Sequence, residues 1–307
     1  MSAATAERAP RLAALALVLN AFIWGTSWWP MRQLQSQGLH PLWATALIFT
    51  LATLVIAAAW PRAIGQVGRT PALWVLVVAA GCTNAAFNWA IVIGDVVRVV
   101  LLFYLMPLWT VLLARVLLGE RLTSAAALRI VVGTAGAAIV LWPDGVDGVS
   151  RSADLVDLLP LPRSLADWLG IVGGFSFALN NVMLRREASR PKEGRSLAMF
   201  AGGALVAGAI AAVLGPGGAV PSVPAPAASW LALVGLLTIV FLAGNLSLQY
   251  GAARLPANRT AVVMLTEVLF ASLSAVALGG GTLTARLALG GALIVSGAVL
   301  AALEPGR

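Results

Sequence analysis

The sequence predicts an all-α membrane protein of ten transmembrane helices, built as two inverted five-helix repeats. Three observations support this prediction. The 307 residues are 60% hydrophobic and only 10% charged, whereas soluble domains carry about 25% charged residues. Ten long apolar runs follow one another along the chain, and the chain aligns weakly with itself at an offset of 161 residues.

Each run is long enough to cross the hydrocarbon core of a bilayer, which needs about 20 apolar residues. The runs cover residues 12–31, 41–60, 72–93, 96–118, 125–142, 165–185, 196–214, 229–251, 257–279 and 284–303. Proline, glycine or charged residues separate them. The first run is too long for the core of a signal peptide, so we expect no cleavable signal.

The distribution of basic residues predicts the orientation in the membrane. With the N-terminus placed inside, 15 of the 20 Lys and Arg residues fall on the cytoplasmic side and 5 on the opposite side. Cytoplasmic loops are enriched in Lys and Arg. We therefore expect a multi-pass protein of a bacterial inner membrane with both termini in the cytoplasm. This bias also explains the net charge of +8 better than nucleic-acid binding does, so we expect no nucleic-acid partner.

The internal alignment divides the chain into a first five-helix repeat at 1–145, an external loop at 146–164 and a second repeat at 165–307. Residues 98–102 match 259–263 in this alignment. Because five is odd, two successive five-helix units must insert with opposite orientations. Inverted repeats of this kind recur in transporters, where they form two similar gates around a central site.

Short motifs in both halves resemble the drug/metabolite transporter superfamily, of the EamA type. Residues 23–30 read IWGTSWWP, 105–108 read LMPL and 119–122 read GERL. Residues 266–271 read TEVLFA, with Val268 where the family usually has proline. Within the superfamily the chain looks most like the bacterial aromatic amino acid exporters of the YddG type.

This resemblance implies a ten-helix basket around a central hydrophobic cavity. It implies export of small amphiphilic metabolites, aromatic and other neutral amino acids above all, by alternating access. The expected partners are such a substrate and the lipid bilayer, and the sequence does not distinguish a monomer from a dimer. A membrane-embedded enzyme and a channel remain the alternatives.

Neither a cofactor nor catalytic chemistry is expected. The chain has one cysteine, Cys82, and one histidine, His40. A Cys/His metal site needs more of these residues than the chain holds. The one histidine available to a serine–histidine–aspartate set is His40, which precedes Pro41 at a helix start and is expected to be an interfacial loop residue, so we find no such set. No phosphate-binding loop of the Gly-Lys-Ser type is present. These features favour a protein that is not an enzyme.

Glu267 is the most informative single residue, because it lies midway along the run at 257–279. An acidic side chain at the centre of a bilayer costs about 2.5–3.5 kcal/mol on insertion scales. We expect it to face a cavity, where it meets a substrate ammonium group or carries a proton. The alternative is a structural glutamate that is protonated or hydrogen-bonded between helices.

Amide and aromatic side chains inside the runs are the other candidate cavity residues. Asn84 and Asn88 share one helix face, and Asn245 and Gln249 share the corresponding face in the second half. The predicted substrate-cavity set is Asn20, Trp24, Trp28, Asn84, Asn88, Trp89, Tyr104, Phe175, Asn181, Asn245, Gln249, Tyr250, Glu267 and Phe270. Flat rings with a few polar groups suit an amphiphilic solute. The alternative for each of them is ordinary packing or hydrogen bonding between helices.

Three further residues are candidates for gating. Pro107 interrupts the run at 96–118 and removes a backbone hydrogen bond there, which makes a pivot or a fixed bend. Asp95 and Arg98 stand three residues apart at the external start of the same run. They could form an ion pair that latches an outer gate.

Overall fold

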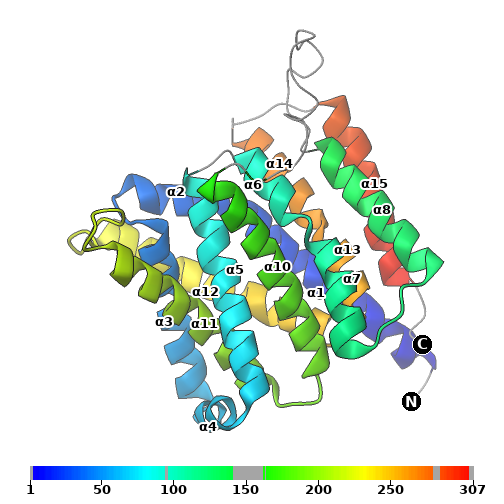
Figure 1. Cartoon of the computed structure of the whole chain (residues 1–307), viewed down its shortest axis with the longest axis horizontal. Helices are drawn as coiled ribbons and strands as arrows, with labels where there is room; N and C mark the ends of the chain where they lie inside the picture. The colour runs from blue at the N-terminus through cyan, green and yellow to red at the C-terminus, as the bar shows by residue number, and fades with distance from the viewer. Residues whose placement is uncertain (1–2, 94–95, 141–161, 163, 279–283, 304–307) are drawn as a thin grey trace.

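The computed structural model describes residues 3–93, 96–140, 162, 164–278 and 284–303 (Figure 1). Within these ranges every regular element is an α-helix, which confirms the all-helical prediction. Among the described residues, five segments are long and apolar enough to cross a membrane, namely Pro10–Ser36, Pro41–Ala59, Pro71–Ile91, Lys192–Leu214 and Ala228–Ala252. The loop predicted at 146–164 lies outside the described residues, apart from Pro162 and Ser164.

The helices follow the predicted runs closely, and most predicted boundaries fall within four residues of the observed ones. The first half contains α1 (Ala3–Thr26), α2 (Trp28–Ser36), α3 (Pro41–Ala59), α4 (Arg62–Arg69), α5 (Pro71–Ile93), α6 (Val96–Phe103), α7 (Met106–Leu118) and α8 (Ser124–Val140). The second half contains α10 (Leu165–Arg186), α11 (Lys192–Leu214), α12 (Ala228–Ala252), α13 (Ala257–Met264), α14 (Thr266–Ala277) and α15 (Ala285–Leu303).

Three runs that the sequence predicts as single helices are each divided in two. The first divides at Ser27, whose hydroxyl donates to the Trp24 carbonyl at 2.8 Å. The second divides between α6 and α7, where Pro107 lies in the first turn of α7 and has no N–H to continue the α6 ladder. The third divides at Leu265, beside which the Thr266 hydroxyl donates to the Val263 carbonyl at 2.8 Å. Each break therefore has a local polar or proline cause.

One short helix, α4, is absent from the prediction. Its sequence carries two arginines, which conceal its amphipathic pattern. Ala63 and Val67 stand four residues apart and are both buried, so α4 covers the end of the bundle with one narrow apolar face.

Small residues allow the helices to approach closely. A Cβ atom at Gly136 of α8 would lie 2.6 Å from the Gly290 carbonyl oxygen of α15, and one at Gly170 of α10 would lie 3.0 Å from the Val99 carbonyl oxygen of α6. Such contacts let backbones pack at short range in a membrane. The helices α5, α10 and α11 form one packed layer, and α8 packs along α15 at the periphery (Figure 1).

The two ends of the bundle differ. The start of α1, the end of α15, the short helix α4 and the turn between α10 and α11 all lie at the same end of the molecule, at the bottom of Figure 1. The centre of the bundle lies between α1, α5, α10, α12 and α14, which places side chains from both halves around one region.

Candidate functional site

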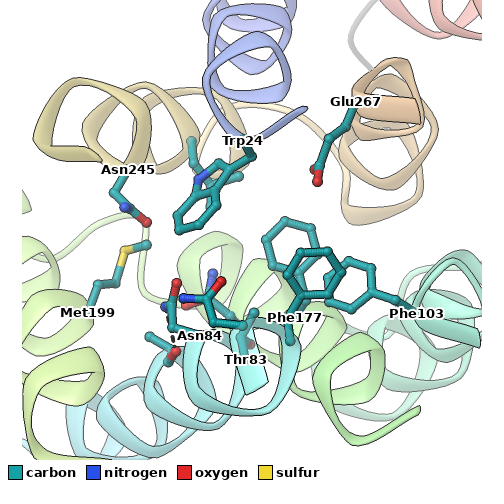
Figure 2. Close-up of a pocket in the computed structure, with 13 residues that line it drawn as sticks. Trp24, Thr83, Asn84, Phe103, Phe177, Met199, Asn245 and Glu267 are labelled. Carbon is teal, nitrogen blue, oxygen red and sulfur yellow. Dashed lines mark hydrogen bonds between the residues drawn. The ribbon is translucent and has the colours of Figure 1, made fainter. Parts of the chain in front are cut away.

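A central cavity lies between helices from both halves of the chain (Figure 2). Its wall comprises Trp24 of α1, five residues of α5, Phe103 of α6, two residues of α10, Met199 of α11, two residues of α12 and Glu267 of α14. In full, the lining residues are Trp24, Ala80, Thr83, Asn84, Phe87, Asn88, Phe103, Phe177, Asn180, Met199, Asn245, Leu248 and Glu267.

Helix α5 contributes one continuous face to this cavity. Ala80, Thr83, Asn84, Phe87 and Asn88 follow the i, i+3, i+4, i+7, i+8 spacing, which places side chains on the same side of an α-helix. The polar residues of this face therefore point inward together, away from lipid.

The amide groups leave acceptor oxygens without donors. The Asn84 amide donates to the Ala80 carbonyl at 2.7 Å, and the Asn245 amide donates to the Phe241 carbonyl at 3.0 Å. A carbonyl only accepts, so the amide nitrogen must face it and the amide oxygen turns away. The Asn180 amide oxygen is buried without a partner among the described residues. The cavity therefore presents hydrogen-bond acceptors in excess.

Glu267 points into the cavity from the first turn of α14, next to Trp24 (Figure 2). It is partly exposed to the cavity and forms no ion pair with a described residue. Gly25 of α1 sets its position, because a Cβ atom there would lie only 2.7 Å from the Glu267 carbonyl oxygen. Glycine lets α14 approach α1 closely, so the carboxylate reaches the cavity.

Aromatic rings form the remaining wall. Trp24 stacks on Phe241 with ring centroids 4.5 Å apart. Phe103 contacts Phe87 at 4.7 Å and Phe177 at 5.7 Å. Rings of this kind present apolar faces and can also bind a cation over their π-systems.

The free space inside the cavity is small in this structure. The space that a water-sized molecule can occupy is about 40 Å³, whereas sites for drug-sized ligands measure about 300–1,000 Å³. The space holds only a few water molecules. A ligand of that size would need the lining side chains or helices to move apart.

Five of the predicted cavity residues meet at this site, namely Trp24, Asn84, Asn88, Asn245 and Glu267. Two others, Gln249 and Tyr250, line a second pocket one turn further along α12. The structure places the remaining seven elsewhere.

Three of those seven hold helices together on the α1 side. The Asn20 amide donates to the Gly244 carbonyl at 2.8 Å, which joins α1 to α12. The Trp28 indole donates to the Ser274 hydroxyl at 2.9 Å. Phe270 contacts Phe22 edge-to-face with centroids 5.4 Å apart.

The other four lie beside or behind the cavity wall. Tyr104 is buried at the break between α6 and α7 and contacts Phe103 edge-to-face at 5.8 Å. Trp89 packs in a separate apolar cluster around Leu42. Phe175 is 39% exposed on the outer face of α10. Asn181 of the same helix is fully buried and does not line the cavity.

Of the three gating candidates, the structure describes the side chain of Pro107 but not those of Asp95 and Arg98. Pro107 is buried in the first turn of α7, directly after the helix break. Asp95 lies outside the described residues, and Arg98 belongs to α6 with a side chain that the structure does not describe. Their predicted ion pair stays a prediction.

Sequence reasoning missed eight lining residues, and two of them carried a usable signal. Phe177 and Asn180 of α10 lie inside the apolar run, and they are three residues apart and share a face. The others are Ala80, Thr83, Phe87, Phe103, Met199 and Leu248, mostly apolar side chains that look like any buried residue of a membrane helix.

The model of the EamA-like transporter family matches residues 11–142 and 164–303. A solved structure described only as the crystal structure of a protein is similar to this chain, with a TM-score of 0.72 and 25% sequence identity. That similarity covers 94% of this chain and 96% of the other. No curated protein matches the chain.

Proposed function

The chain belongs to the EamA-like transporter family, and we propose that it exports amphiphilic metabolites, above all aromatic and other neutral amino acids, across a bacterial inner membrane. Transport proceeds by alternating access of the central cavity to the two faces. The observation that carries this proposal is the composition of the cavity, where a carboxylate and unpaired amide oxygens face aromatic rings.

The acceptors favour a substrate that brings hydrogen-bond donors and positive charge. Glu267 and the amide oxygens of Asn84, Asn180 and Asn245 need donors that the described side chains do not supply. A protonated amino group offers three N–H donors and a charge that complements Glu267. An ammonium group is therefore the part of the substrate that this cavity is best suited to bind.

The aromatic wall favours an apolar side chain on that substrate. Phe103 and Phe177 lie across the cavity from Asn245 and Met199 (Figure 2). A substrate ring can stack against the first pair while its ammonium group reaches Glu267. This division between an apolar and a polar wall supports neutral amino acids with large side chains.

Two features of the chain support ten spans in two inverted repeats. The family model matches two separate segments of similar length. The breaks at Tyr104, between α6 and α7, and at Leu265, between α13 and α14, stand 161 residues apart, which equals the offset of the internal alignment. In this proposal each broken pair is a single span with a hinge at the level of the cavity, as in other transporters with discontinuous helices.

The charge distribution supports the proposed direction of insertion. The start of α1 and the end of α15 lie at the same end of the bundle as α4 and the end of α10 (Figure 1). Helix α4 runs from Arg62 to Arg69, and Arg185 lies in the last turn of α10. Excess Lys and Arg mark the cytoplasmic side. We place this end, with both termini, in the cytoplasm.

Counterflow in liposomes tests the proposal. The purified protein is reconstituted, the vesicles are loaded with unlabelled phenylalanine, and uptake of labelled phenylalanine is followed. We expect saturable uptake that depends on the internal load. Linear, unsaturable uptake would indicate a channel, and absence of flux for every neutral amino acid would overturn the proposal.

Competition with half-substrates tests the role of the ammonium group. Phenethylamine has the ring and the ammonium group, whereas 3-phenylpropionate has the ring and a carboxylate. We expect phenethylamine to compete with phenylalanine and 3-phenylpropionate to compete weakly. The reverse order would contradict the assignment of Glu267 and the amide oxygens to the ammonium group.

A further inference from the structure

A second pocket of about 350 Å³ lies near the ends of α3, α11 and α12. It is separate from the central cavity, and most of the charged side chains that line it are cationic. Lys192 and Arg195 come from the first turns of α11, and Arg254 follows the end of α12. Among the described residues, Glu193 is the only carboxylate in its wall, so this lining carries a net positive charge.

Arg195 is the central feature of this pocket, because its side chain is only 5% exposed. One guanidinium N–H group donates to the Leu184 carbonyl at 3.3 Å, and Nε has no acceptor among the described residues. The nearby Glu187 pairs instead with Arg190 and, at 3.7 Å, with Arg186. Glu187 and Glu193 attract this guanidinium electrostatically, but neither forms an ion pair with it among the described residues. A buried guanidinium without a directly bonded carboxylate is costly. An anion from outside the chain could supply the acceptor that Arg195 Nε does not find among the described residues of the pocket.

Other groups around the pocket favour an anion as well. The Arg254 guanidinium lies 3.7 Å from the centre of the Tyr250 ring, which holds it at the rim of the pocket. Helix α11 begins at Lys192 with no side-chain cap, and the uncapped N–H groups of a helix N-terminus favour negative charge. These groups surround one space with donors.

The lip of the pocket is apolar and faces outward. Trp60, Leu246 and Tyr250 line it and are 39%, 37% and 37% exposed. Aromatic residues at helix ends favour the headgroup level of a bilayer. Basic pockets between membrane helices, close to that level, are suited to anionic headgroups. The lip thus matches acyl chains, and the interior matches a phosphate.

We propose that this pocket binds a phosphate group, supplied in the membrane by the headgroup of an anionic phospholipid. The phosphate oxygens accept hydrogen bonds from Arg195, Lys192 and Arg254, while the acyl chains lie against Trp60 and Leu246. This site is independent of the proposed transport function, because none of these side chains lines the central cavity.

The experiment compares two double variants in nanodiscs. Lys192→Gln with Arg254→Gln removes two cations of the pocket. Arg115→Gln with Arg121→Gln removes two exposed arginines elsewhere and controls for general surface charge. Native mass spectrometry measures phosphatidylglycerol retained per protein in mixed phosphatidylglycerol and phosphatidylcholine nanodiscs, and size-exclusion chromatography verifies folding.

We expect the wild type and the control to retain phosphatidylglycerol selectively. The pocket variant should bind it about thirtyfold more weakly, from about 1 kcal/mol for each basic residue near an anionic headgroup. The single variant Arg195→Gln should also lose selectivity. Equal retention by the two double variants would overturn the proposal.

A second arm separates the lipid from a soluble anion. The wild type in lipid-free detergent is heated with inorganic phosphate and, separately, with phosphatidylglycerol. Stabilisation by phosphatidylglycerol alone supports the lipid source, and stabilisation by inorganic phosphate as well supports a soluble phosphate source. In both cases the pocket variant should lose the effect. No stabilisation by either probe would overturn the site, whatever the outcome of the counterflow assay.

Discussion

The side-chain amide of Gln249 donates a hydrogen bond of 2.5 Å to the hydroxyl of Ser196, and this bond joins α12 to α11. Both residues line the second pocket, which also contains Lys192, Arg195 and Arg254 and which we call the basic pocket. Met199 and Asn245, which stand about one turn away on the same two helices, line the central cavity. The bond therefore lies where the two spaces approach each other, at the end of the bundle that we place in the cytoplasm.

Removing this bond should make the central cavity more accessible from the basic pocket. An interhelical hydrogen bond in a membrane protein is worth about 0.6 kcal/mol on average. Gln249→Ala should therefore raise the population of the conformation in which the central cavity is open to the basic pocket about threefold. The reporter is a cysteine at Met199, introduced in a Cys82→Ala background, and the measurement is its labelling rate with a membrane-impermeant thiol reagent.

Ser296→Ala supplies the matched control for this experiment. Within the described part of the chain, its hydroxyl donates only to the Ala292 carbonyl of its own helix, at 2.7 Å. The control should leave the labelling rate at Met199 unchanged. If Gln249→Ala also leaves it unchanged, the bond does not separate the two spaces.

Neutralising Glu267 should reduce transport without loss of fold. Hydrogen bonds to charged groups are worth about 1.5–3 kcal/mol, so Glu267→Gln should lower phenylalanine counterflow about ten- to hundredfold. Glu193→Gln is the control, because it removes a carboxylate that lies outside the central cavity. Wild-type flux in a well-folded Glu267→Gln protein would remove this residue from the mechanism.

Two phenylalanines of α10 distinguish the cavity wall from the outer face. Phe177 lines the cavity, whereas Phe175 is 39% exposed and contacts Trp109 edge-to-face. Loss of an aromatic contact costs about 0.5–1.5 kcal/mol. Phe177→Leu should therefore raise the KM for phenylalanine about two- to tenfold and change the KM for alanine less. Phe175→Leu should leave both values near those of the wild type, and equal effects of the two changes would contradict the cavity assignment.

Helix α10 also shows what the sequence could and could not predict. The apolar run predicted the helix, and its aromatic and amide residues were recognised as candidates. Phe175 and Phe177 stand two positions apart and Asn180 and Asn181 one, so the two members of each pair point in different directions around the helix. Sequence alone favoured Phe175 and Asn181, whereas Phe177 and Asn180 face the cavity. The choice depends on how α10 packs against α5 and α6, and those contacts are long-range.

Helix α5 was better predicted for a simple reason. Asn84 and Asn88 share one face, and an unpaired amide is too costly to face lipid, so the polar positions alone indicated the inward side. The helix break at Leu265 had no such signal, because no proline stands there. The Thr266 hydroxyl donates to the Val263 carbonyl, and hydrogen bonds of this kind are common in membrane helices.

Gly25→Ala should disturb the position of Glu267. The added Cβ atom would lie 2.7 Å from the Glu267 carbonyl oxygen and 2.8 Å from Phe270 Cβ, so α14 must move away from α1. Overpacking of this kind costs about 1–3 kcal/mol, measurable as a lower melting temperature together with reduced counterflow. Gly235→Ala is the matched control, because a Cβ atom there meets nothing within 4 Å. A stable, fully active Gly25→Ala protein would show that the close approach of the two helices is unimportant.

Glu120 should make stability depend on pH at the end of the bundle that carries the basic residues. Burial raises its pKa above the usual 4.5, although Arg185, the backbone N–H of Ala257 and Arg259 oppose that shift. The folded state therefore holds the proton more tightly than the unfolded state does. The resulting stabilisation is fully present below the unfolded pKa and is lost as the pH rises through the folded pKa.

Glu120→Gln imitates the protonated carboxyl group, so it should not lose stability in this way. Melting temperatures of the two proteins in detergent are compared from about pH 4 to about pH 7, a range that spans the titration of an ordinary or modestly shifted glutamate. We expect the difference to grow in favour of Glu120→Gln as the pH rises. His40, whose pKa burial lowers, titrates in both proteins and cancels in that difference. A difference that stays constant would show that attraction to Arg185 and Arg259 cancels the effect of burial, and one that reverses in favour of the wild type would show that this attraction outweighs burial.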